Sequence, residues 1–97
     1  MHEATTEPNE HVRFTLHEPR RVVQAHPDGS TNDFDPFEWG TFTRGSLVVH
    51  AVKIPRPFRV GGDICRDGYL VYDGRLAAIS TPTFDREYRP MRTQAAA

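Results

Sequence analysis

Five histidines are the side chains in this chain best suited to bind a metal. They are His2, His11, His17, His26 and His50. No spacing among them matches a metal-binding motif, in which ligands usually cluster in the sequence. His11 and His17 share a face of a predicted strand but lie about 20 Å apart at the usual rise per residue. His26 and His50 could meet across a barrel. We predict no metal site and no cofactor.

Four carboxylates stand in one stretch that contains no base. They are Asp28, Asp33, Asp35 and Glu38. Paired carboxylates can do acid–base chemistry or bind a cation. A calcium loop is not favoured, because the loop glycine and the bidentate glutamate are both missing. The favoured interpretation is a solvated loop in which Asp35 caps a short helix.

The same stretch carries three aromatic residues within six positions. These rings could plug the mouth of a small barrel. They could also form an exposed anchor for a protein partner, because aromatic residues concentrate binding energy at interfaces. Both interpretations stay open, and the neighbouring carboxylates would suit a basic partner. The predicted partner-binding residues are Phe34, Asp35, Phe37, Glu38 and Trp39.

Basic residues dominate the stretch from 44 to 75, which contains six of them and only three aspartates. Small barrels bind single-stranded nucleic acid by stacking bases on aromatic rings beside arginines. The alternative site is therefore a nucleic-acid-binding one that uses Arg56, Phe58, Arg59 and Tyr69. The charge excess is small for a dedicated binder, so scattered, solvated arginines are the simpler interpretation.

Signatures of nucleophilic catalysis are missing from the sequence. It holds no Gly-rich phosphate loop, no Gly-x-Ser-x-Gly turn and no cysteine pair. The one cysteine, Cys65, follows an isoleucine in a predicted strand, which is typical of a buried, inert thiol. A chain of 97 residues is also short for a water-excluding catalytic cleft. We predict that the protein is not an enzyme.

Short strands must position these residues. Apolar residues at every second position over residues 11–17 predict a half-buried strand. Further strands are predicted over residues 21–26, 41–44, 47–54 and 58–60, with the most apolar, 47–54, at the centre of its sheet. Asp35 followed by proline predicts one helical turn that ends at Gly40.

The C-terminal third predicts a hairpin followed by a helix. Asp73 and Gly74 form a two-residue turn signal, which would set Tyr72 opposite Arg75 and Val71 opposite Leu76. The segment 82–88 predicts a short helix with Phe84 and Tyr88 on one face.

The fold class that follows is mainly β. We predict a small five- to seven-stranded barrel or roll with one helical turn and a short C-terminal helix. Residues 11–90 would form one β-rich domain, with flexible tails over residues 1–10 and 91–97. The net charge is -1 and the longest apolar run is too short to span a membrane. These features predict a soluble protein without a membrane partner.

A resemblance supports a biological context. Gly62, Asp63, Gly74, Pro82, Phe84 and Tyr88 match a C-terminal pattern in which a Gly-Asp turn, a hairpin and a Pro-x-Phe-x-x-x-Tyr helix follow one another. Over residues 61–90 the chain resembles small, uncharacterised phage and prophage proteins with this pattern. It departs from them in having Gly61 where they carry a proline. The resemblance implies the genomic context of a phage or mobile element, for which we expect a place in the cytoplasm of a bacterial host or in a virion.

The predicted function is a non-enzymatic protein-interaction module. The resemblance implies the genomic context of a phage or mobile element, and the aromatic and acidic segment 34–39 leads us to expect an accessory protein that binds a host or phage protein. Single-stranded nucleic-acid binding and a structural role in a virion are the alternatives.

Overall fold

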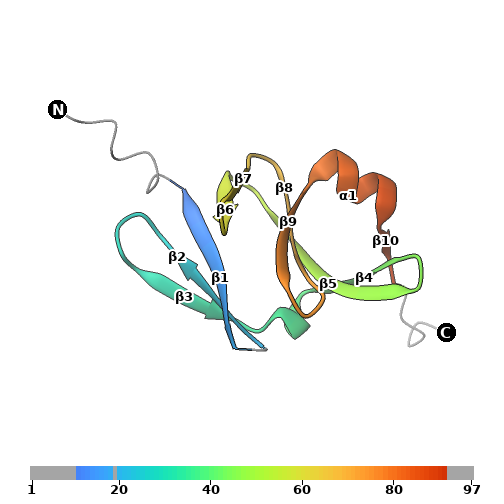
Figure 1. The fold of residues 1–97 in the computed structure, drawn as a ribbon, viewed down its shortest axis with the longest axis horizontal. Helices are drawn as coiled ribbons and strands as arrows, with labels where there is room; N and C mark the ends of the chain where they lie inside the picture. The colour runs from blue at the N-terminus through green and yellow to red at the C-terminus, as the bar shows by residue number, and fades with distance from the viewer. Residues whose placement is uncertain (1–10, 19, 92–97) are drawn as a thin grey trace.

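The first sheet forms where apolar residues alternate with polar ones. In the computed structural model, which describes residues 11–18 and 20–91, its strand order is β3-β2-β1-β6-β7 (Figure 1). Neighbouring strands are antiparallel except β1 and β6, which pair in parallel with Val12 opposite Phe58. The strands are β1 (Val12–Glu18), β2 (Arg21–Ala25), β3 (Thr31–Phe34), β6 (Phe58–Val60) and β7 (Asp63–Cys65).

The second sheet is antiparallel throughout, with the order β10-β4-β5-β8-β9. Its most apolar strand, β5, is its central strand, as the sequence predicts. Two prolines follow β5 and end it, because proline cannot donate to a sheet ladder. The strands are β4 (Gly40–Arg44), β5 (Leu47–Ile54), β8 (Gly68–Tyr72), β9 (Leu76–Ser80) and β10 (Arg89–Pro90).

An inner core lies between the two sheets. The rings of Phe14 and Phe58 meet edge to face, with centroids 5.7 Å apart. Leu70 approaches them from the second sheet and is fully buried. The buried residues of this core are Val12, Phe14, Val22, Phe58, Cys65 and Leu70. Both sheets therefore contribute one face to the same core, as in a sandwich.

A short helix covers the other face of the second sheet. Helix α1 (Thr81–Glu87) carries a proline in its first turn, where the missing N–H costs no hydrogen bond. Phe84 and Tyr88 are buried, and the rings of Tyr69 and Phe84 stack with centroids 3.7 Å apart. The predicted C-terminal helix and its buried face are confirmed.

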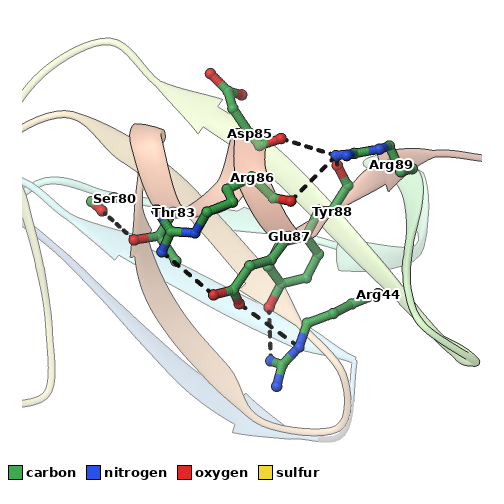
Figure 2. A network of polar contacts seen from close by, with 8 residues as sticks. All are labelled: Arg44, Ser80, Thr83, Asp85, Arg86, Glu87, Tyr88 and Arg89. Atoms are coloured by element: carbon green, nitrogen blue, oxygen red, sulfur yellow. Dashed lines mark hydrogen bonds and ion pairs between the residues drawn. The ribbon is translucent and has the colours of Figure 1, made fainter.

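Polar contacts fix the C-terminal end of α1, as Figure 2 shows. Arg44, at the end of β4, donates to the Tyr88 hydroxyl over 3.4 Å and forms an ion pair with Glu87. Arg89 donates to the carbonyl oxygens of Asp85 and Tyr88, each over 3.0 Å. These carbonyls have no partner within the last turn of a helix, so the arginine caps it.

The hairpin between β8 and β9 has a three-residue loop, so the predicted two-residue turn is wrong by one residue. Tyr72 lies opposite Leu76, and the Asp73 N–H donates to the Arg75 carbonyl over 3.1 Å. This register places Leu76 on the inner core and leaves Ile79 on the helix-covered face. The predicted register would exchange the two faces, because a shift by one residue turns every side chain over.

The mainly β class, with one helical turn and a short C-terminal helix, is confirmed. The described residues form two five-stranded sheets, so of the predicted barrel or roll the structure has the two-layer arrangement, with more strands than the five to seven predicted. The extra strands include β3, whose polar sequence carries little strand signal, and the two-residue β10. No helix in the described part of the chain has the length and apolar character to cross a membrane.

The predicted boundary at residue 90 differs slightly from the structure. The Met91 N–H donates to the Thr41 carbonyl over 2.9 Å, so Met91 belongs to the folded domain. Apart from Met91, the predicted tails over residues 1–10 and 91–97 lie outside the described residues.

Candidate functional site

A capped turn between the sheets positions the predicted partner-binding residues. The 3-10 helix η2 (Pro36–Glu38) follows β3 directly and leads into β4. The Asp35 carboxylate accepts a hydrogen bond from the Phe37 N–H over 2.9 Å, and Pro36 occupies the first helical position. The predicted cap and helical turn are confirmed.

The ring of Phe37 is exposed but held from two sides. It stacks on the His50 ring with centroids 4.8 Å apart, and the Arg20 guanidinium lies 4.6 Å from its centroid. It is still 50% exposed. An aromatic ring fixed in this way loses little freedom when it binds a partner, as interface anchors require.

Arg20 also pairs with the Asp35 carboxylate, so one arginine contacts both the cap and the ring. This hydrogen-bonded ion pair, together with the Phe37 N–H, holds the pKa of Asp35 below its ordinary value. The same contact raises the pKa of Arg20. Since a second ion pair joins Asp33 to Arg21 over 3.0 Å, much of the predicted acidic character of this segment is neutralised.

Phe34 and Trp39 line a small apolar cleft between the sheets, here called the aromatic cleft. Its volume is about 190 Å³, and its lining residues are Phe14, Gln24, Phe34, Trp39, Val52 and Ile54. Trp39 is half-buried and packs against the inner core, whereas Phe34 is 39% exposed. The aromatic segment is therefore neither a simple plug nor a simple anchor.

The residues of the predicted nucleic-acid site do not share a surface. Phe58 is fully buried in the inner core, and Arg59 follows it on the opposite face of the first sheet. Tyr69 stacks on Phe84 against the helix, on the far face of the second sheet. Arg56 is exposed near the end of β5. Neither ring offers a free face beside an arginine on which a base could stack.

The histidines do not gather at one site, although His11 and His26 line the same cleft beside the β2–β3 turn. His26 contacts the Asn32 amide over 3.1 Å, while His50 stacks on Phe37. His17 contacts the Thr15 hydroxyl, and His2 lies outside the described residues. Over residues 11–18 and 20–91, no three metal-ligating side chains come together.

Sequence reasoning missed four residues of the aromatic cleft, Phe14, Gln24, Val52 and Ile54. They come from β1, β2 and β5, and only the packing of the two sheets brings them to Phe34 and Trp39. Their alternation identifies them as facing the core, but no local motif marks them as a site.

No family model matches the chain, and no curated protein or solved structure is significantly similar to it. The geometry of the aromatic cleft and of the turn beside it thus carries the functional argument.

Proposed function

We propose that this protein is a protein-interaction module that takes an apolar side chain of a partner protein into the aromatic cleft. The observation that carries the proposal is the cleft itself, with five apolar lining residues and one polar residue, Gln24. Sites for small molecules usually have volumes of about 300–1,000 Å³. A cleft of about 190 Å³ suits one aliphatic or aromatic side chain better than a metabolite.

The neighbouring turn supplies the rest of the binding surface. Phe37 and Arg20 belong to the residue types that are enriched at protein interfaces. Asp35 and Arg20 restrain each other through their ion pair, so the surface beside the cleft is ordered before a partner arrives. Preorganisation of this kind lowers the entropic cost of binding.

The resemblance to small phage and prophage proteins bears on the partner class. It supports the genomic context of a phage or mobile element, in which the accessory protein that we propose would bind a host or phage protein, in the cytoplasm of a bacterial host or in a virion. The half-exposed Phe34 at the cleft supports protein recognition independently of that resemblance.

A test uses the fact that Trp39 is the one tryptophan of the chain. The immobilised protein is screened against a library of random linear peptides, and tryptophan-free peptides that bind are synthesised. We expect the selected peptides to share an aliphatic or aromatic residue, and to change the emission of Trp39 as they fill the cleft.

Phe34→Ser should lower the affinity for these peptides by about tenfold, because it removes apolar contact area from the cleft wall. Leu47→Ser is the matched control, since Leu47 is 44% exposed and does not line the cleft. Equal binding by the Phe34 variant, or a screen that selects no peptide, would contradict the proposal.

A further inference from the structure

The strand next to the aromatic cleft has a free edge. β3 is the outermost strand of the first sheet, where it pairs only with β2 among the described strands. Figure 1 shows β3 at the margin of the molecule, with no other labelled element on its outer side. An unpaired edge offers a row of backbone N–H and C=O groups to another chain.

The register shows which backbone groups point outward. The His26 N–H donates to the Ser30 carbonyl over 2.9 Å at the end of the β2–β3 hairpin. In an antiparallel pair, hydrogen-bonded and non-hydrogen-bonded positions alternate. Asn32 and Phe34 therefore bond to β2, and the N–H and C=O groups of Thr31 and Asp33 point away from the sheet.

Side chains alternate in the same way and connect this edge to the cleft. Phe34 lies opposite Val22, which is buried in the inner core, so Phe34 and Asn32 stand on the inner face of the sheet. Phe34 lines the aromatic cleft. A strand added alongside β3 would carry its own inward side chains to the open side of that cleft.

The other three edge strands are less suited to strand addition. β10 has two residues, and the second is Pro90. β7 and β9 lie against each other where the two sheets come together. β3 combines four residues, no proline and an adjacent apolar cleft.

We propose, resting on the proposed function, that the partner binds as an extended strand paired with β3. Its backbone would exchange hydrogen bonds with Thr31 and Asp33, and one inward side chain would enter the aromatic cleft. Backbone pairing supplies affinity in such strand addition, and pockets for alternate side chains supply specificity.

The occupant is a segment of another protein. If two copies of β3 paired in antiparallel through Thr31 and Asp33, the residue opposite Phe34 at the cleft would be Asn32 or Ser30 of the second copy, and both are polar. The terminal segments 1–10 and 92–97 hold no Phe, Tyr, Trp, Leu, Ile or Val, and their apolar side chains are Met1, Pro8 and alanines. None of these segments alternates bulky apolar and polar side chains as a strand beside the cleft requires.

Charge adds a further property of the partner strand. Asp33 is already paired with Arg21, so the middle of the edge requires no charge from the partner. Asp28 and Glu38 flank β3 in the sequence, and neither forms an ion pair with another described residue. The partner strand should alternate apolar and uncharged polar residues, with lysine or arginine at its ends.

The test uses a peptide with that chemistry, acetyl-Lys-Thr-Leu-Thr-Phe-Thr-Leu-Lys-amide, which contains no tryptophan. Trp39 emission reports filling of the cleft, and amide hydrogen exchange followed by NMR reports pairing with the edge. We expect exchange at Thr31 and Asp33 to slow by at least about tenfold, whereas Asn32 and Phe34 change little because they already bond to β2.

Asp33→Pro removes an outward N–H at an edge position, where proline is tolerated. It should abolish peptide binding, and Asp33→Ala should retain it. A melting curve for each variant confirms folding. A peptide methylated at the backbone nitrogens that face β3 removes the same hydrogen bonds from the peptide side. It should fail to bind the unaltered protein, whereas the unmethylated peptide should bind.

The outcomes separate the two proposals. A change in Trp39 emission without slower exchange at Thr31 and Asp33 would overturn strand addition and leave cleft binding standing. A peptide that produces neither change would overturn both. Slower exchange at these residues without peptide, together with a dimer in analytical ultracentrifugation, would show that a second copy occupies the edge instead.

Discussion

Asp35 holds the 34–39 segment together through both oxygens of one carboxylate. One oxygen accepts from the Phe37 N–H and caps η2, and the other pairs with Arg20 from the β1–β2 connection. The same arginine lies over the Phe37 ring. The orientation of the exposed ring therefore depends on a carboxylate that stays ionised.

Asp35→Asn should lower the stability of the fold near neutral pH, with the difference shrinking in acid. The pKa of Asp35 is lower in the folded chain, so its contribution is present above the unfolded pKa of about 3.9. It is lost as the pH falls through the lower folded pKa. Urea unfolding of both proteins near pH 7 and near pH 2 measures this, with Asp63→Asn as an exposed control. A difference that stays constant with pH would show that the charge of Asp35 is not involved.

Gly74→Val should lower the melting temperature clearly. Gly74 has a φ of 101°, which L side chains adopt at a cost of about 1–3 kcal/mol. Gly62→Ala is the control, because Gly62 does not have a positive φ and a Cβ there would meet no atom within 4 Å. An unchanged melting temperature for the valine variant would mean that the loop can relax to another conformation.

At the scale of elements, α1 covers the second hydrophobic core, which is formed by Val49, Ala51, Val71, Phe84 and Tyr88. Its Phe84 ring stacks between Tyr69 and Tyr88, with centroid distances of 3.7 Å and 4.6 Å. Arg44 and Arg89 then fix the end of the helix (Figure 2). One short helix thus covers the face of β5 and β8 that points away from the first sheet.

Phe84→Ala should destabilise the protein by about 3–5 kcal/mol, because Phe84 is 2% exposed and its removal leaves a cavity. Thermal or urea unfolding measures the loss. The neighbouring Asp85→Ala is the control, since Asp85 is exposed on the same helix. Equal stability of the two variants would show that α1 contributes little to the fold.

Elements with a strong local signal could be predicted from the sequence. Alternation identified the strand that carries Phe14, and the cap at Asp35 identified η2. β3 could not be found, because Thr31–Phe34 is exposed throughout and forms a strand through pairing with β2. The hairpin register depends on which face Leu76 buries, and that is decided by the opposite sheet rather than by the turn.

The site was predictable only in part. The sequence pointed to Phe34, Phe37 and Trp39 as a group, and the structure places Phe37 on His50 but Phe34 and Trp39 at the cleft. The arginines that neutralise Asp33 and Asp35 come from β2 and the turn before it, so no local motif could reveal them.

For the whole molecule, the charge and the burial of the rings favour protein over nucleic acid as the ligand. The net charge is -1, and the two aromatic rings of the predicted nucleic-acid site pack in separate cores. We expect no binding of a single-stranded oligonucleotide at physiological salt in a fluorescence anisotropy titration. Sub-micromolar binding that falls steeply with salt, and that Arg56→Ala with Arg59→Ala weakens, would reverse the ranking of the two functions.

The parallel pairing of β1 with β6 has a consequence for the order in which the chain acquires its structure. Strands β1, β2 and β3 follow one another and can form a meander early, but the other side of β1 stays open until Phe58 and its neighbours are synthesised. Contacts between residues far apart in sequence slow folding. A meander that formed before residues 58–60 paired with β1 would leave Val12, Phe14 and Val22 without Phe58 and Leu70, which complete their core. We expect the pairing of residues 58–60 with β1 to be a late step of refolding, because it joins strands that lie far apart in the sequence.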